Sequence, residues 1–318
     1  MHTVRDSTES ESQMSSTYPE GDPRRVLAGT VPGAAAHAGA RPASVFDLSR
    51  ERPDGVLPRG SRCWTVRGQN FTVRLIDLRA AEEVGSQEQA DEHVVVVAVG
   101  TVRVSDAKST TAEVTAPAIV IVPPGGCRLT AVSDGRVVLV SSVDDDGRMP
   151  AARNADGYRS PDTTVAAPGP PARSRVPGLR VYPMNDVRND PGRLGRIVRS
   201  STLMVNWFPD QTEPRDGEML SPHAHDDFEQ CTVTLAGTFV HHLRTTWTSR
   251  MSQWRDDVHT RVDSPSITLI PPPLVHTTQG VEGDLFQLVD VFSPPRQDFL
   301  DQGWVLNADD YVADREMQ

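Results

Sequence analysis

The feature that most constrains this chain is an internal duplication of short apolar segments. The segment Ala118–Gly125 (AIVIVPPG) parallels Ser266–Pro273 (SITLIPPP), and Glu92–Gly100 (EHVVVVAVG) parallels Glu229–Gly237 (EQCTVTLAG). In each copy one apolar run ends at a turn glycine, a second run ends in Pro-Pro, and a third run follows. A repeat of this kind predicts two copies of one supersecondary unit rather than two unrelated domains.

Each copy is predicted to consist of β-strands. The short runs are rich in Val, Ile, Leu, Thr and Phe, and Gly, Pro and Asp residues separate them. Helical periodicity is weak throughout the chain. Short β-branched runs at regular spacing, with turn residues between them, are typical of a β-sandwich or barrel. The predicted fold class is therefore all-β, with two barrels in one chain.

Composition suggests where the two copies begin and end. Residues 1–43 are rich in Ser, Glu, Pro, Gly and Ala without apolar periodicity, so we expect a disordered tail. Residues 144–178 are dense in Pro, Gly and charged residues, which is typical of a linker. These assignments leave a first folded block at 44–143, a second at 179–312, and a short tail at 313–318.

Charge and composition narrow the classes of partner. The 318 residues carry a net charge of −11, from 43 acidic and 32 basic side chains, without basic clusters. Nucleic-acid binding needs concentrated Lys and Arg, so we do not expect it. There is no apolar run of the ~18 residues that a membrane span needs, and the N-terminus lacks the apolar core of a secretory signal. We therefore expect a cytoplasmic protein without a membrane role, forming a homodimer and binding a small molecule.

The second copy carries a histidine pattern that suggests a metal site. His223 and His225 precede the adjacent pair Glu229 and Gln230, and His276 follows the Pro-rich strand end. Residues two apart on a strand face the same side, so the first two histidines can both point into a barrel. Imidazole nitrogens with a carboxylate or amide oxygen suit Fe(II), Mn(II), Ni(II) or Zn(II). Three histidines and one oxygen leave room for a substrate, as in catalytic sites.

The fourth ligand has two candidates. The spacing to Gly237 indicates Gln230, whereas the spacing to His225 indicates Glu229. Only one of two neighbours on a strand can face inward. We favour Gln230 and keep Glu229 as the alternative. A neutral Gln would leave the metal more positive than a Glu would, which favours polarisation of a bound oxygen.

The whole pattern resembles the cupins. The shared features are His-x-His, a spaced acid or amide, a turn glycine, and a histidine after a Pro-rich strand end. Most of the second block matches and the first block is a weaker copy, so the chain resembles a bicupin with two jelly-roll (double-stranded β-helix) barrels. The resemblance implies one divalent transition metal per chain, with Fe(II) first and Mn, Ni or Zn as alternatives. One departure is Pro273, which stands where the second cupin motif has Gly.

The first copy is predicted to lack the metal ligands. When the turn glycines are aligned, the ligand positions hold Ser86, Glu88, Glu92 and His93, and the Pro-Pro pairs align Arg128 with His276. The same comparison suggests Ser142 as the counterpart of Asp290. We therefore expect the N-terminal block to be a degenerate cupin with a structural role.

The last strand of the second copy suggests a substrate pocket. The segment DVFSPPR, from Asp290 to Arg296, resembles one cupin subgroup that includes enzymes opening the ring of 4,5-unsaturated uronates. That resemblance implies a pocket lined by Asp290, Phe292 and Arg296. Asp290 would act as a general acid or base, Arg296 would bind a carboxylate, and Phe292 would form a wall. The alternatives are an Asp that caps a turn and an Arg in a surface ion pair.

The region between the two motifs is longer in the second copy. It spans Thr238–His259 and contains two Trp and three of the nine His residues. It is either a flap that shapes the substrate site or an ordinary hairpin or dimer contact. Within it we assign His241 as an inward proton-transfer group, and Arg244 and Trp247 as substrate-binding residues.

Three functional hypotheses follow from these patterns. The leading one is a metal-dependent enzyme with isomerase, lyase or cyclase-type Lewis-acid chemistry on a small, anionic, oxygenated carboxylate such as a sugar acid or keto acid. The second is an Fe(II)-dependent cupin dioxygenase. The third is a non-catalytic ligand-binding cupin.

Overall fold

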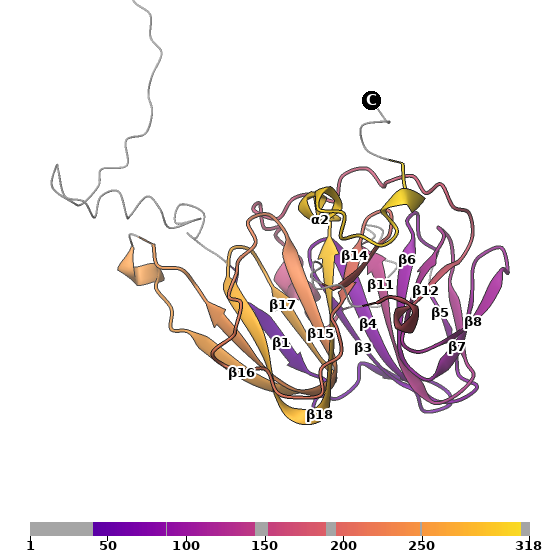
Figure 1. Cartoon of the computed structure of the whole chain (residues 1–318), viewed down its shortest axis with the longest axis horizontal. Helices are drawn as coiled ribbons and strands as arrows, with labels where there is room; N and C mark the ends of the chain where they lie inside the picture. Colours follow the sequence, from indigo (N-terminus) through magenta and orange to yellow (C-terminus); the bar gives the residue numbers. More distant parts are fainter. Residues whose placement is uncertain (1–40, 87, 144–151, 189–194, 249, 313–318) are drawn as a thin grey trace, which may run out of the picture.

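The computed structural model describes residues 41–86, 88–143, 152–188, 195–248 and 250–312. Two β-barrels lie side by side, the first in indigo and magenta and the second in orange and yellow (Figure 1). The predicted all-β, two-barrel fold is confirmed. In the described part of the chain, no helix is long and apolar enough to cross a membrane.

The first barrel consists of two sheets. The larger sheet has the strand order β12-β9-β6-β11-β4-β3-β2 and the smaller one β5-β10-β7-β8. Their bounds are β2 Gly55–Val56, β3 Arg62–Arg67, β4 Phe71–Leu78, β5 Glu83–Gly85, β6 His93–Val99, β7 Thr101–Ser105, β8 Thr111–Thr115, β9 Ala118–Val122, β10 Arg128–Ala131, β11 Gly135–Ser142 and β12 Arg180–Pro183.

The second barrel is one sheet wrapped around itself, in the order β1-β17-β15-β18-β14-β13, with β16 also paired to β15. Two long strands make this possible, because they contribute to both halves of the barrel. Their pairing shifts register around Gly237, whose positive φ of 89° favours glycine. The bounds are β1 Ser44–Asp47, β13 Arg196–Arg199, β14 Met204–Trp207, β15 Glu229–Arg244, β16 Val258–Asp263, β17 Ser266–Ile270 and β18 Val275–Ser293, followed by helix α2 Gln297–Asp301.

The largest apolar core lies between the two barrels. Cys231 and Val233 of the second barrel and Val94 and Val96 of the first belong to one buried cluster. Side chains alternate along a strand, so the residues between them face the interior of their own barrel. The two barrels therefore pack face to face through one side of each large sheet. The other side of each sheet faces the interior of its own barrel.

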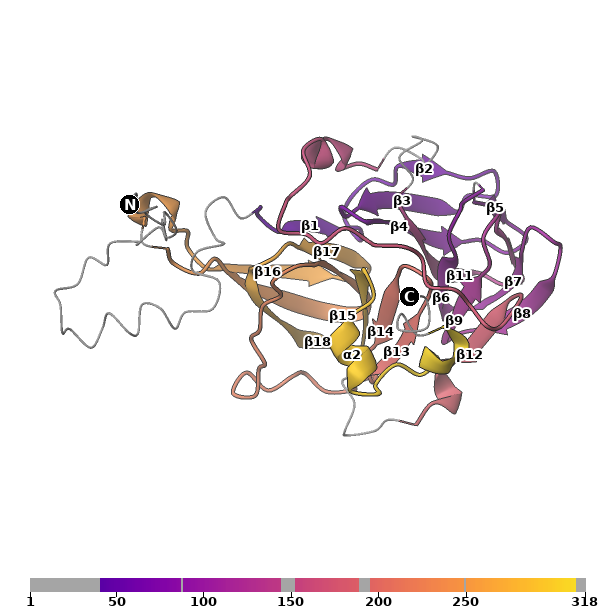
Figure 2. The same cartoon turned by 90° about the horizontal axis from the view of Figure 1, so that it is seen from above.

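The barrels exchange their first strands. Strand β1 pairs with β17, and β12 pairs with β9 (Figures 1 and 2). The predicted blocks 44–143 and 179–312 therefore do not coincide with the two barrels' sheets, since each block begins with a strand that pairs in the other barrel. The composition changes on which we placed them mark where regular structure stops, and they do not indicate which sheet the next strand joins.

The predicted linker is packed where the structure describes it. Residues 152–178 include a 3-10 turn at Ala155–Tyr158 and the buried side chains of Val165 and Ala172. The Asn154 side chain exchanges hydrogen bonds of 2.9 and 2.8 Å with the Arg67 backbone. The predictions for 1–40, 144–151 and 313–318 lie outside the described residues.

Candidate metal centre

Three histidines meet at one end of the second barrel. His223 and His276 form an isolated β-bridge, with backbone hydrogen bonds of 3.1 and 2.8 Å, and His225 follows two residues later. One ring nitrogen from each of the three lies within 4.8 Å of the others. His225 and His276 are buried and His223 is exposed, so the group opens to solvent on one side.

Backbone carbonyls orient two of the rings. His223 Nδ1 donates to the Ser221 carbonyl at 2.9 Å, and His276 Nδ1 donates to the Leu274 carbonyl at 3.0 Å. In a neutral imidazole, one nitrogen carries the proton and the other keeps a lone pair. Because Nδ1 donates the hydrogen bond in both rings, Nε2 has the lone pair that could bind a metal. Such carbonyl partners are typical of histidines that bind metals.

Burial keeps the two inner histidines neutral. It lowers the pKa of His225 to about 2 and that of His276 to about 4, and neighbouring imidazoles contribute to both shifts. A metal needs the neutral form of imidazole. At neutral pH both rings are therefore in the form that a metal binds.

The side-chain oxygen of Gln230 lies beside the three histidines, where it could serve as a fourth metal ligand. Its Oε1 lies 2.8 Å from His225 Nε2 and 3.3 Å from His276 Nε2. Its Nε2 donates to Thr232 Oγ1 at 3.0 Å, and that hydroxyl donates to Asp290 Oδ1 at 2.6 Å. Because the hydroxyl proton goes to Asp290, the hydroxyl oxygen can only accept from Gln230, which turns Oε1 toward the histidines. Three imidazoles and one amide oxygen fit a borderline divalent transition metal.

Glu229 points the opposite way, and the structure does not bring it to the histidines. Its side chain accepts hydrogen bonds from the Tyr158 hydroxyl at 2.6 Å and from the Gln69 backbone N–H at 2.8 Å. The first partner belongs to the linker and the second to the first barrel. Burial raises the pKa of Glu229, and these two donors oppose the shift. The alternative ligand of the sequence analysis is thus a contact between the barrels.

The corresponding residue of the first copy has the same role. Glu92 accepts hydrogen bonds from the Ser201 backbone N–H at 2.8 Å and from the Tyr311 hydroxyl at 2.7 Å, and it pairs with Arg180. Each of these two glutamates therefore binds residues outside its own repeat, either in the other repeat or in the linker. The sequence contained this signal, because a residue that recurs in the copy without metal ligands is more simply explained by structure than by metal binding.

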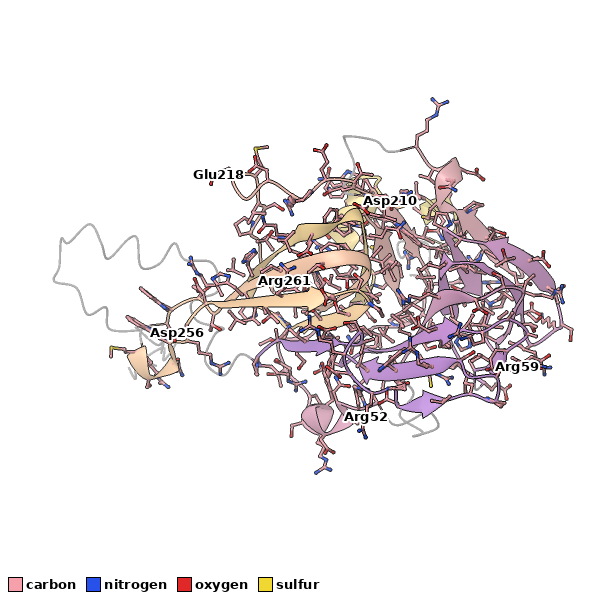
Figure 3. The ribbon with its side chains drawn as sticks, turned by 90° about the horizontal axis from the view of Figure 1, so that it is seen from below. Arg52, Arg59, Asp210, Glu218, Asp256 and Arg261 are labelled. Atoms are coloured by element: carbon pink, nitrogen blue, oxygen red, sulfur yellow. The ribbon has the colours of Figure 1, made fainter. Side chains whose placement is uncertain are left out.

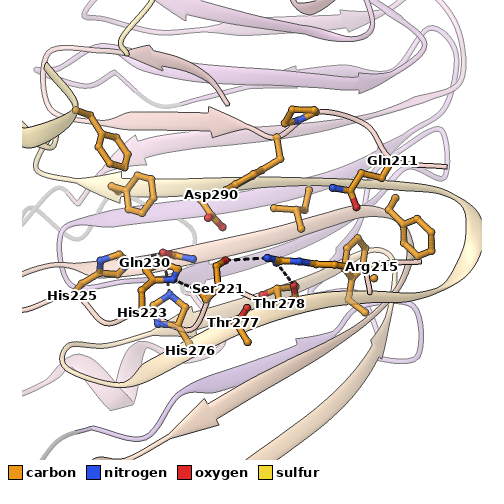
Figure 4. A pocket seen from close by; sticks show the side chains of 18 of the residues that line it. Gln211, Arg215, Ser221, His223, His225, Gln230, His276, Thr277, Thr278 and Asp290 are labelled. Carbon is orange, nitrogen blue, oxygen red and sulfur yellow. Dashed lines mark hydrogen bonds between the residues drawn. The ribbon is translucent and has the colours of Figure 1, made fainter. Parts of the chain in front are cut away.

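A cavity of about 140 Å³ lies beside the three histidines, inside the second barrel (Figure 4). It opens between β14, β15, β18 and the segment that leads to His223. Its walls include Phe208, Gln211, Arg215, Ser221, Phe239, Thr277, Thr278, Phe286, Leu288, Asp290, Phe292, Arg296 and Phe299. The three residues predicted from the DVFSPPR segment all line it.

Asp290 lies in the middle of the cavity wall, between the histidines and the far end in Figure 4. It pairs with Thr232 across the two long strands. Burial raises its pKa to about 7, and the hydrogen bonds from Thr232 and Gln230 oppose that shift. A carboxyl group of this kind can exchange a proton near neutral pH.

Arg296 both lines the cavity and forms an ion pair. Its Nε donates to Asp298 Oδ1 at 2.9 Å, while Nη1 lies 3.4 Å from His225 Nδ1. Its guanidinium carbon lies 3.9 Å from the centre of the Phe299 ring and 4.7 Å from that of Phe228. Asp298 therefore occupies one edge of the guanidinium group, and the edge near His225 faces the metal centre. Phe292, 2% exposed, forms a wall of the cavity.

Two predicted substrate-binding residues lie outside this cavity. Arg244 pairs with Asp257, and Trp247, 64% exposed, stacks on Trp254 with ring centres 4.4 Å apart. Arg244, the last residue of β15, pairs with Val275 of β18 and borders a separate pocket with His276. Trp247 lies on the arm between β15 and β16, and Asp256 marks the outer part of that arm in Figure 3. Neither residue lines the cavity that holds Asp290, and their assignment as substrate-binding residues stays a prediction.

His241 is buried but does not line the cavity. Its Nδ1 bonds to Thr278 Oγ1 at 3.0 Å, and Thr278 does line the cavity. Burial lowers the pKa of His241 to about 4. The predicted inward orientation is observed, with one side chain between His241 and the cavity.

Sequence reasoning missed Thr232 and Arg215. Thr232 lies two residues after Gln230 on one strand, so the alternation of side chains could have indicated that both face inward. Arg215 donates to the Thr278 carbonyl at 3.1 Å and to Ser221 Oγ at 3.0 Å, and it thereby ties the segment before His223 to β18. It lies in an irregular segment, where no periodicity indicates orientation.

Comparisons with known proteins support the fold. No protein-family model matches the sequence, and no curated protein does. A variant of the oxalate decarboxylase of Bacillus subtilis superposes with a TM-score of 0.54 at 11% identity, covering 80% of this chain and 78% of that chain. The formate complex of Lactobacillus farciminis oxalate decarboxylase gives 0.52 at 12% identity, with 81% and 88% covered. The Escherichia coli protein Ylba, assigned to DUF861, gives 0.51 at 13% identity, with 83% and 97% covered. These likenesses show the two-barrel cupin fold.

Proposed function

We propose that this chain is a metal-dependent enzyme with isomerase, lyase or cyclase-type chemistry on a small oxygenated carboxylate. The observation that carries the proposal is the convergence of three imidazoles and the Gln230 amide oxygen beside a cavity that also holds Asp290 and Arg296. Two of the similar structures are named as decarboxylases of oxalate, itself a small carboxylate. This is consistent with the proposed class of substrate.

His223, His225, His276 and Gln230 would hold one divalent transition metal, with Fe(II), Mn(II), Ni(II) and Zn(II) all compatible with this donor set. When bound, the metal supplies Lewis-acid polarisation of a substrate oxygen. The nitrogen and amide ligands carry no negative charge of their own at neutral pH. The site therefore favours an anionic ligand although the whole chain is acidic.

Asp290 is the residue placed to move a proton. The Thr232 hydroxyl fixes its Oδ1 relative to Gln230, so the carboxyl group has a set position beside the ligand group. A substrate in the cavity meets this carboxyl group in mostly apolar surroundings, where water competes weakly for the proton. Arg296 would neutralise the carboxylate of the substrate through its edge near His225, and Phe292 would exclude water from that side.

The test uses the purified full chain, with metal content measured by mass spectrometry. Loss of small hydroxy and keto acids is followed by chromatography, and oxygen uptake is recorded alongside with an oxygen electrode. We expect about one transition metal per chain and turnover without oxygen uptake. Asp290→Asn should retain the metal and lower kcat by roughly 10² to 10⁴, the usual contribution of general acid–base catalysis. The matched control is Asp284→Asn, an exposed residue on the same strand.

Three outcomes would contradict this function. Oxygen uptake that depends on substrate would indicate the dioxygenase instead. A protein that binds no metal and turns over none of these acids would leave only the non-catalytic binding function. Full activity of the His276→Ala variant would contradict a metal-dependent reaction at this site.

A further inference from the structure

We infer that the substrate carries a short branched apolar tail behind its carboxylate, rather than a chain of hydroxyl groups. This inference rests on the proposed function, because it assumes that the polar end of the substrate meets the histidines. It concerns the opposite end of the cavity, where four apolar side chains form what we call the outer wall: Phe208, Phe239, Phe286 and Leu288.

Backbone contacts place the outer wall away from the metal centre. Phe286 exchanges backbone hydrogen bonds of 3.2 and 2.7 Å with Gln211. In Figure 4, Gln211 and Arg215 lie at one end of the cavity and His225 at the other. The Phe239 ring packs edge-on against Phe286, with ring centres 5.8 Å apart. The outer wall thus contains a packed pair of aromatic rings, with Leu288 against the same cluster.

Glycine at position 280 makes room for this surface. A Cβ atom at Gly280 would lie 2.5 Å from the Phe286 ring, which is closer than atoms can approach. The Phe286 ring therefore lies directly over the backbone of β18. Any larger residue at position 280 would push the ring from its place in the cavity wall.

Several polar groups at this end have partners within the protein. Arg215 Nη1 donates to the Thr278 carbonyl, and Nη2 donates to Ser221 Oγ at 3.0 Å and to the Met219 carbonyl at 3.2 Å. Thr278 Oγ1 bonds to His241. These contacts join the segment before His223 to β18 and use part of the hydrogen-bonding capacity at this end of the cavity.

A polyol would find few partners there. Each hydroxyl brings one donor and two acceptor positions, and leaving them unpaired in a buried site is unfavourable. Thr277 Oγ1 is buried without a hydrogen-bond partner among the described residues, so it offers one contact, and the exposed Gln211 offers others at the rim. An alkyl tail needs no such partners and would bury apolar surface against the outer wall.

The polar end of the substrate is short as well, because the cavity has polar partners for only a few oxygen atoms. The histidines, Asp290 and the edge of Arg296 near His225 form one polar group at the other end of the cavity. They can serve a carboxylate and one neighbouring oxygen. The ligand class that fits is a 2-oxo or 2-hydroxy acid with a small branched alkyl tail.

The test compares three probes by calorimetry on the full chain loaded with Mn(II): 4-methyl-2-oxopentanoate, pyruvate and gluconate. Each buried methylene group strengthens binding about fourfold. We therefore expect the branched acid to bind at least about tenfold more tightly than pyruvate, and gluconate to bind no more tightly than pyruvate. Equal binding of the branched acid and pyruvate, or tightest binding of gluconate, would overturn the inference.

Two variants test whether the outer wall causes the preference. Phe286→Ala should reduce the ratio between the branched acid and pyruvate to less than about threefold. The control is Val262→Ala, because Val262 belongs to the same apolar cluster without lining the cavity, and it should keep the wild-type ratio. Leu288→Ala is the smaller change to use if Phe286→Ala does not fold. A wild-type ratio in the variant that folds would overturn the inference.

Failure of the proposed function can be told apart from failure of the inference. A chain that binds no Mn(II) and turns over no acid contradicts the proposed function. The ratio between the branched acid and pyruvate can still be measured in that chain with EDTA present, because the outer wall includes none of the histidines. A ratio near one there would overturn the inference as well, and a ratio of about ten would support it.

Discussion

The two barrels share one strand register but fill their interiors differently. Gly100 and Gly237 mark corresponding turns, so each interior position of the first barrel has a counterpart in the second. One row crosses three neighbouring strands in both barrels, and it is aliphatic in the first and polar in the second. The two rows are Val95, Val120 and Leu139, and Thr232, Thr268 and Asp290.

The difference shows how one fold serves two purposes. In the first barrel, Val95 and Leu139 are buried in an apolar cluster that fills the interior. In the second, a hydroxyl and a carboxyl at the matching positions bond to each other and to Gln230, and a cavity opens beside them. The register also corrects one prediction: the counterpart of Asp290 is Leu139 and not Ser142. Counting from the Pro-Pro pairs could not reveal this, because pairing between strands sets the match.

The strongest way to break the comparison is to give the first barrel the carboxylate of the second. Leu139→Asp places a charge in a filled apolar interior without the hydroxyl partner that Asp290 has. We expect the free energy of unfolding to fall by about 3–5 kcal/mol, measured by urea unfolding. Leu139→Met, which keeps volume and polarity, should cost less than about 1.5 kcal/mol. Equal stability of the two variants would show that the first barrel is not filled as described.

The adjacent residues Glu229 and Gln230 allow the structural and metal-binding roles to be separated. Glu229→Ala removes the acceptor of the Tyr158 hydroxyl and the Gln69 amide, so we expect a loss of about 1–3 kcal/mol in unfolding free energy. Its metal content after dialysis should equal that of the wild type. Gln230→Ala should instead lower metal affinity. The reverse pattern of metal loss would make Glu229 the ligand.

The smallest effect concerns His93, which stands in the first barrel where Gln230 stands in the second. Burial lowers the pKa of His93, and its ring bonds to Ser141 and to the Gly125 carbonyl. Below the unfolded-state pKa of about 6.5 the unfolded chain takes up a proton that the folded chain does not, so stability falls as pH decreases. One such group contributes at most about 1.4 kcal/mol per pH unit.

The variant His93→Gln should therefore lose less stability than the wild type between pH 7 and pH 5, as measured by urea unfolding at each pH. Both proteins should have parallel stability curves above pH 7, where the imidazole is neutral in either state. Identical slopes below pH 6.5 would mean that His93 is protonated in the folded chain.

The sequence predicted those features that local pattern determines. The alternation of apolar residues indicated strands, the duplication indicated two barrels, and the spacing of His223, His225 and His276 indicated a group that the structure does bring together. Local pattern could not indicate that β1 pairs with β17, because strand partners far apart in sequence are chosen by packing. It also could not indicate that the arm with Trp247 continues outward, since a flap and an outward hairpin have the same composition.

The exchange of β1 and β12 has a consequence for how such a chain can be shortened in evolution. A gene that lost its first copy would also lose the strand that covers β17, and it would leave that strand's hydrogen-bonding edge bare. A gene that lost its second copy would lose the strand beside β9. Each barrel thus contains one strand that the other repeat encodes. Such an arrangement retains both repeats whether or not each has chemistry of its own.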